Sequence, residues 1–290
     1  MTDTPDEPIA LRPPIFEDRP PKPVRKDEIE LADRGLFIES WLPERRSRRH
    51  PLLMVHGELG GSWLWHRFQE YLAGRGFETH ALNLRGHYWS DVADLEHASF
   101  DDYADDLRAA VERIGRGPVL VGHGMGALLC LAIASGEHVS GLVLLGPMLP
   151  GELRSPARPY ELRAVPAVFR RDFIGWRGLP EAIRRENPDL TLADVLRIQH
   201  LMGGESGAVR RDALAGISVG SSLVREVPAL VVGGGLDREH PLPDTEALAL
   251  WLGAEFEPFA DHSHYGLVAG ETSHEPVAAR VRHFLDEQRL

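Results

Sequence analysis

The sequence predicts an α/β fold in which a mainly parallel, doubly wound β-sheet carries helices on both faces. Three observations lead to this fold class. Short apolar runs typical of buried strands alternate with segments of helical apolar spacing over residues 51–146. The same alternation resumes at residue 227 and continues to the C-terminus. Between these stretches, residues 148–226 resemble consecutive helices punctuated by prolines, and we expect them to form a helical cap over the strand ends.

Composition restricts the class of protein. The chain has 290 residues, of which 43% are hydrophobic and 26% charged, enough for one large domain with an insertion. A net charge of -12 argues against nucleic-acid binding, which requires a basic face. No apolar run approaches the roughly 18 residues of a membrane span, and no signal-peptide core is evident. A single cysteine, Cys130, fits a reducing compartment. We therefore expect a cytoplasmic protein that binds neither nucleic acid nor a membrane.

The N-terminal residues 1–27 are predicted to form an extended or disordered arm, because prolines interleaved with charges leave little surface to bury. Ile15 and Phe16 could dock on the body or on a second subunit, which would allow a homodimer. The folded core is expected to start at residue 28, where residues 28–43 alternate weakly and predict an antiparallel hairpin.

The next strand, at residues 51–55, runs into the glycine-rich loop His56-Gly57-Glu58-Leu59-Gly60. Glycine lets a main-chain N–H approach a substrate oxygen, as an oxyanion hole requires. The main chain of Glu58 or Leu59 would supply that donor, and His56 would orient the loop. The carboxylate of Glu58 would oppose catalysis unless it points outward or is protonated.

Two further strand–helix units follow. A helix is predicted at 65–74, a strand at 77–84 and a second helix at 100–114, whose first turn carries acidic residues that suit a helix N-terminus. His87 and Tyr88 come directly after the strand. They fall at the carboxyl edge of the sheet, where ligands collect in such folds.

Gly122-His123-Gly124-Met125-Gly126 joins an apolar strand at 118–121 to an apolar helix at 125–134. This is the frame of a nucleophile elbow, G-x-S-x-G, with glycine in place of serine. The flanking glycines allow strand and helix to pack closely. Gly124 carries no group that could attack a substrate, so the question of function turns on this position. The main chain of Met125 would be a second oxyanion donor, and His123 is expected to be structural.

After a strand at 139–145 and the helical segment, the sheet pattern resumes at 227–233 and reaches Asp237. An acid just past a strand is where the acid of a catalytic triad would lie. A helix at 245–252 precedes a last strand at 254–259, a loop with His262 and His264, and a closing helix at 276–285.

Over residues 28–290 the chain resembles the α/β-hydrolase family. The motifs that carry the resemblance are Val55-His56-Gly57, Asn83-Leu84-Arg85-Gly86-His87, the glycine elbow, residues 233–237 and the histidine loop at 262–264. Their order, with nucleophile, acid and histidine in turn, is the family's order. The resemblance implies a core of residues 28–147 and 227–290, and a cap or lid of residues 148–226.

The resemblance also implies roles for individual residues. Asp237 would be the acid and His264 the base, because His264 is followed by Tyr265-Gly266 like the usual histidine at the head of the final helix; His262 is the alternative base. His56, His87 and Tyr88 are expected near the substrate. Trp176 and other cap aromatics could line the pocket or simply hold the cap together. The sequence shows no metal-ligand cluster and no nucleotide fingerprint, so neither a metal nor a cofactor is expected.

Three functions remain open. The protein could be a hydrolase of esters or related acyl bonds of a small molecule in which Gly124 is an engineered inactivation. It could instead use His264 and Asp237 as a general base, acting on water or on a substrate in a lyase-like or cofactor-free oxygenase-like reaction. It could also be a binding module that kept the pocket and lost the chemistry. An acid and a histidine in the right order favour the first two.

Overall fold

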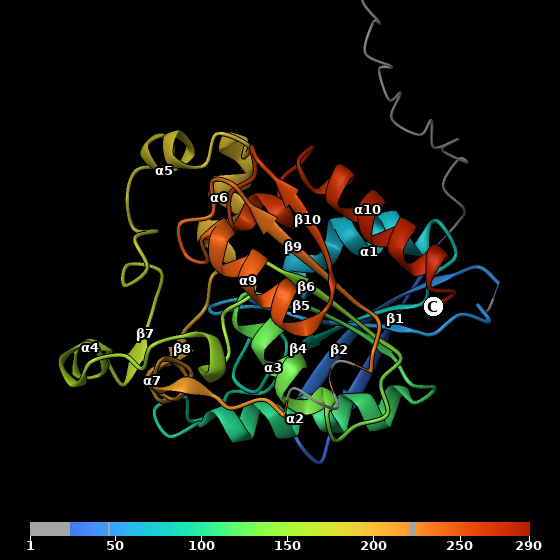
Figure 1. Ribbon diagram of the computed structural model, residues 1–290, viewed down its shortest axis with the longest axis horizontal. Helices are drawn as coiled ribbons and strands as arrows, with labels where there is room; N and C mark the ends of the chain where they lie inside the picture. Colours follow the sequence, from blue (N-terminus) through green and yellow to red (C-terminus); the bar gives the residue numbers. More distant parts are fainter. Residues whose placement is uncertain (1–23, 46, 221–223, 225) are drawn as a thin grey trace, which may run out of the picture.

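The computed structural model describes residues 24–45, 47–220, 224 and 226–290 (Figure 1). Most of the predicted arm lies outside this part of the chain. Its last four positions do not: β1 (Val24–Leu31) begins before residue 28 and pairs along its whole length with β2 (Leu36–Pro43) as an antiparallel hairpin. The boundary between arm and core therefore lies earlier than the sequence predicted.

Within the described residues the main sheet has eight strands in the order β1-β2-β4-β3-β5-β6-β9-β10. Only the hairpin is antiparallel to its neighbour; the pairs from β4 to β10 are all parallel. The parallel strands are β3 (Leu52–Val55), β4 (Thr79–Asn83), β5 (Val119–His123), β6 (Gly141–Leu145), β9 (Ala229–Gly234) and β10 (Glu255–Phe259). This topology confirms the predicted fold class.

Helices cover both faces of the sheet (Figure 1). Alternate residues of one strand enter different hydrophobic clusters: Leu53 and Val55 pack with the helices of one face, and Leu52 and Met54 with those of the other. This is the pattern of a parallel sheet buried on both sides. The first face carries α2 (Phe100–Ile114), α3 (Met125–Ala134) and α9 (Leu242–Leu252), and the second carries α1 (His66–Ala73) and α10 (His274–Glu287).

The helix that follows the elbow, α3, is fixed against the sheet by two glycines. A Cβ on Gly126 would lie 2.4 Å from the carbonyl oxygens of Val55 and His56, and a Cβ on Gly122 would lie 2.4 Å from the Cα of Ala127. Neither position can accept a side chain, because both obstacles are main chain. The backbone of α3 therefore lies against the ends of β3 and β5.

The segment between β6 and β9 does not continue the main sheet. It contains η2 (Gly151–Leu153), α4 (Pro159–Ala164), α5 (Pro180–Glu186), α6 (Leu192–Leu201) and α7 (Gly207–Gly216), and a two-residue strand pair, β7 (Val168–Phe169) with β8 (Glu205–Ser206), that the sequence did not predict. In Figure 1 most of this segment lies to the left of the sheet. No helix among the described residues has both the length and the apolar character of a membrane span.

Candidate active site at Gly124

The elbow turn holds Gly124 at φ +56° and ψ −120°, between the end of β5 and the start of α3. This backbone conformation strains any residue with a side chain by about 1–3 kcal/mol. A Cβ at this position would lie 3.2 Å from Nε2 of His264 and 3.7 Å from Nε2 of His240. The backbone of residue 124 therefore directs its missing side chain toward two imidazoles.

His264 and Asp237 form a buried pair beside Gly124. Nδ1 of His264 donates to Oδ2 of Asp237 over 2.8 Å. The second oxygen, Oδ1, accepts the backbone N–H groups of Glu239 and His240, each over 2.9 Å. Because Asp237 holds Nδ1 as the protonated nitrogen, Nε2 faces Gly124, the orientation that a general base requires.

The charges of this pair stabilise each other. Burial on its own would lower the pKa of His264, but the carboxylates of Asp237, Glu239 and Glu58 outweigh burial and raise it to about 9. Burial would raise the pKa of Asp237, whereas the His264 imidazolium and the hydrogen bonds bring it down to about 2. The imidazolium–carboxylate form is thus favoured at neutral pH.

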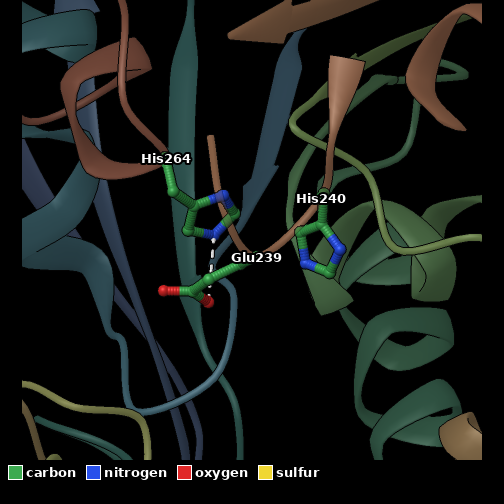
Figure 2. A group of neighbouring side chains, drawn as sticks. All are labelled: Glu239, His240 and His264. Atoms are coloured by element: carbon green, nitrogen blue, oxygen red, sulfur yellow. Dashed lines mark ion pairs between the residues drawn. The ribbon is translucent and has the colours of Figure 1, made fainter. Parts of the chain in front are cut away.

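Two residues that the sequence analysis did not single out complete the cluster (Figure 2). Oε2 of Glu239 lies 3.9 Å from Nε2 of His264, and the His240 ring lies 5.1 Å from the His264 ring, centroid to centroid. Burial, followed by the charge of His264, lowers the pKa of His240 to about 3, so this imidazole is neutral. Both residues lie in the turn whose backbone N–H groups donate to Asp237. Their positions two and three residues after the predicted acid could have identified them in the sequence.

The space between these side chains is small. It amounts to about 10 Å³, roughly what one water molecule needs. An organic substrate cannot enter without a movement of the surrounding chain. The residues around this space are Gly57, Glu58, Gly60, Leu64, His123, Gly124, Met125, Glu239, His240, His264 and Tyr265.

The predicted oxyanion donors are only partly available. Glu58 and Met125 both line the cavity. Leu59 does not: its N–H donates to Oε2 of Glu205, over 3.0 Å. Of the two loop N–H groups considered, that of Leu59 therefore already has a carboxylate partner.

The side chain of Glu58 places a buried carboxyl group in the site. It forms an ion pair with Arg210 of α7, yet its Oε1 is buried and has no hydrogen-bond partner among the described residues. Burial, opposed by Arg210 and reinforced by neighbouring carboxylates, raises the pKa of Glu58 to about 7. The Glu58 carboxyl group is therefore partly protonated near neutral pH.

Three of the predicted substrate-binding residues lie elsewhere. His56 is fully buried and accepts the N–H of Leu84 through Nε2. His87 is also buried, and its Nε2 donates to Glu205 over 3.2 Å. Tyr88 borders a separate surface hollow beside the β1–β2 hairpin. None of the three is among the residues that line the cavity at Gly124, so their predicted contact with a substrate stays a prediction.

The remaining two predicted residues are also outside the cavity. Nε2 of His262 donates to the carbonyl oxygen of Ser273, over 2.9 Å, and its ring packs on Phe259. His262 therefore does not compete for Asp237. Trp176 is buried, and its ring lies 4.8 Å from that of Tyr265, edge to face. It packs behind one wall of the cavity and does not line it.

Comparison with known proteins agrees with the fold and the order of the motifs. The profile of the α/β-hydrolase fold family matches residues 50–181. The chain therefore has the α/β-hydrolase fold. The profile match includes the loop at Glu58 and the elbow at Gly124, while Asp237 and His264 lie beyond it.

Proteins similar to this chain are enzymes of several kinds. An (S)-hydroxynitrile lyase from Manihot esculenta is 28% identical over 115 residues, which cover 38% of this chain and 44% of the lyase. The match thus spans less than half of that relative. Among solved α/β-hydrolase structures, a thermophilic esterase from Thermogutta terrifontis is 22% identical, with a TM-score of 0.66 over 92% of this chain and 100% of the esterase. A bromoperoxidase from Bacillus anthracis has the same TM-score at 16% identity, over 91% and 100%.

Proposed function

We propose that this protein is an enzyme that acts on a small molecule without a covalent nucleophile, using His264 as a general base oriented by Asp237. One observation carries the proposal: Nε2 of His264 lies 3.2 Å from the point where a side chain of residue 124 would begin. The proposal assigns the base to His264 and the orienting acid to Asp237, and Gly124 has no side chain that could act as a nucleophile. Water in the small cavity would take its position.

The hydrolytic reaction that we propose is a direct attack of water. Nε2 of His264 takes a proton from the water while the water oxygen bonds to the acyl carbon. The main-chain N–H groups of Glu58 and Met125 stabilise the oxyanion, and the proton passes from Nε2 to the leaving group as the acyl bond breaks. The reaction is expected to be slow, since a serine protease without its serine loses about 10⁶-fold in turnover. It is also expected to be faster in alkaline solution, because the free base is the minority form of His264 at neutral pH.

Removal of a proton from the substrate itself is the second candidate. The similarity to an (S)-hydroxynitrile lyase favours this candidate. Removal of a proton from the substrate needs a base but no acyl-enzyme intermediate. Hydroxynitriles are therefore the first substrates to test beside activated esters.

We further propose that residues 148–226 act as a cap. Two contacts tie this segment to the loop at Glu58: Arg210 pairs with the Glu58 carboxylate, and Glu205 accepts the Leu59 N–H. Because the cavity holds about one water molecule, a substrate can enter only when such contacts open.

The His264→Ala protein is expected to lose at least about 10²-fold of the parent's activity toward activated short-chain esters or hydroxynitriles, since a general base contributes about 10²–10⁴-fold. The matched control is His262→Ala, because His262 lies on the same loop but bonds to Ser273. Initial rates are measured for the three proteins, and hydrolysis is repeated in ¹⁸O-labelled water, where label is expected in the acid product. Equal rates for the parent and His264→Ala on every substrate would contradict the proposal.

A further inference from the structure

We propose that Glu239, His240 and His264 form a binding site for a divalent transition-metal ion, with Zn²⁺ as the representative species. One ligand atom from each of the three residues lies within 4.8 Å of the other two. Figure 2 shows the three side chains as neighbours and marks the ion pair between Glu239 and His264. The proposal uses the same cavity as the proposed function but does not depend on the reaction.

The second shell of a metal site is already built. A histidine that binds a metal commonly donates its other ring N–H to a carboxylate, which fixes the tautomer and the ring orientation. His264 has this arrangement, since Nδ1–H donates to Asp237 over 2.8 Å, and Nε2, which would give up its proton to the ion, is on the side of Gly124. Asp237 is held in turn by two backbone N–H groups of the turn that carries Glu239 and His240. The acid therefore orients the His264 ring and holds the backbone of the turn that carries the other two ligands.

The space for an ion exists because residue 124 is glycine. A side chain there would start 3.2 Å from Nε2 of His264 and 3.7 Å from Nε2 of His240, in the middle of the ligand set. The cavity of about 10 Å³ has room for one small species. A single metal ion would occupy this space, and its ligands would move inward to reach it.

One unsatisfied group also points to a cation. Among the described residues, Oε1 of Glu58 is buried without a hydrogen-bond partner. The Glu58 side chain is 8% exposed and lines the same cavity. A buried carboxylate oxygen without a donor is costly, and a metal ion or its bound water would satisfy it.

The ligand set selects the kind of metal. Two imidazoles and a carboxylate suit Zn²⁺, Co²⁺ or Fe²⁺, whereas Mg²⁺ and Ca²⁺ prefer sets made of oxygen. Ligand bonds of about 2.0–2.2 Å require the ligand atoms to approach one another by about an ångström. Glu239 can make this movement, because its side chain is 31% exposed and lies in a turn. Glu58 or a water molecule would complete the coordination.

A bound ion would change the chemistry of the site. It would take the Nε2 lone pair, so His264 could not act as a base, and the ion itself would bind and activate water. The metal-free and metal-bound proteins would thus react by different routes. The expectation from sequence that no metal site exists is revised here, because the ligands become neighbours only when the loop at 262–264 folds onto the turn at 237–240.

The test is a Co²⁺ titration of the full-length protein after treatment with a chelator, followed by visible absorption, with Zn²⁺ competition measured by calorimetry. We expect one equivalent of Co²⁺ with the intense absorption of a four- or five-coordinate ion, displaced by Zn²⁺. Glu239→Gln and His240→Ala are each expected to weaken binding at least about tenfold. Both residues are at least partly exposed, so the variants should remain folded, which circular dichroism verifies.

The control is His262→Ala, which removes a histidine of the same loop that lies outside the cavity and should leave the affinity unchanged. Stoichiometric Co²⁺ binding by a protein that shows no catalytic turnover would still support the metal site. No stoichiometric binding, or equal affinity for the parent, Glu239→Gln and His240→Ala, would overturn the proposal while leaving the proposed general base untouched.

Discussion

The Gly124→Ser protein is expected to hydrolyse activated short-chain esters about 10²- to 10³-fold faster than the parent. The backbone of residue 124 already has the elbow conformation, and a Cβ would lie 3.2 Å from Nε2 of His264. A hydroxyl added there comes within reach of a base that Asp237 orients. The estimated gain is part of the roughly 10⁶-fold that a nucleophile contributes in a serine protease, reduced by the strain of a side chain at this backbone conformation and by its close approach to His264. Initial rates on chromogenic esters of several chain lengths measure it.

Two controls separate the hydroxyl from its surroundings. Gly124→Ala adds the same Cβ without a hydroxyl, occupies the space proposed for the attacking water, and should show no gain over the parent. In the double variant Gly124→Ser, His264→Ala, the gain should disappear. An increase with alanine would mean that the added methyl group and not a nucleophile changes the rate. A folded Gly124→Ser protein that hydrolyses none of the esters, whatever their acyl chain length, would contradict the hypothesis of an inactivated serine hydrolase.

Glu205→Ala is expected to lower the free energy of unfolding by about 3–5 kcal/mol, the usual cost of removing one partner from a buried ion pair. The Glu205 carboxylate is fully buried and accepts hydrogen bonds from Tyr103 over 2.7 Å, from His87, from Leu59 and from the N–H of Ser206. Truncation leaves the donors of Leu59, His87 and Tyr103 unsatisfied in the interior. Urea unfolding measures the loss, with Glu181→Ala, on the exposed face of α5, as the control that should change little. A loss below about 1 kcal/mol would show that this network does not stabilise the fold.

The same pair predicts how that loss depends on pH. Burial would raise the pKa of Glu205, but His87 and the other donors lower it, so its contribution is present above the unfolded pKa of about 4.3 and is lost as pH falls through the lower folded pKa. Burial would lower the pKa of His87, whereas Glu205 raises it, so its contribution is present below about pH 6.5 and is lost as pH rises through the higher folded pKa. The stability difference between parent and Glu205→Ala should be largest between about pH 4.5 and 6.5.

The sequence predicted the parts of the fold that local patterns determine. The helices at 100–114 and 125–134 appear with those bounds, the first because Ser99 and Asp102 form a reciprocal cap and the second because the elbow glycines fix where it begins. The order of motifs along the chain also anticipated that Asp237 and a histidine of the 262–264 loop would be neighbours. These predictions rest on residues close in sequence or on a family's fixed order.

What the sequence could not show are contacts between distant residues. The Leu59 N–H meets a carboxylate 146 positions away, and Glu58 meets Arg210, 152 positions away. Nothing near Leu59 signals that its N–H is already occupied. His87 was assigned to the substrate because it follows a strand, yet Glu205, from the β7–β8 pair that the sequence did not predict, binds it. The Glu239–His240 pair was missed for the same reason, since it meets His264 only after the chain folds.

Labelling with a fluorophosphonate, followed by intact-protein and peptide mass spectrometry, tests the central claim most directly. The reagent forms a stable bond with a serine that an adjacent histidine activates, and it needs no knowledge of the substrate. We expect no adduct on the parent, one adduct at position 124 of Gly124→Ser, and none on the double variant Gly124→Ser, His264→Ala. An adduct on the parent would show that another residue acts as a covalent nucleophile, and a folded Gly124→Ser protein that stays unlabelled would show that His264 does not serve position 124.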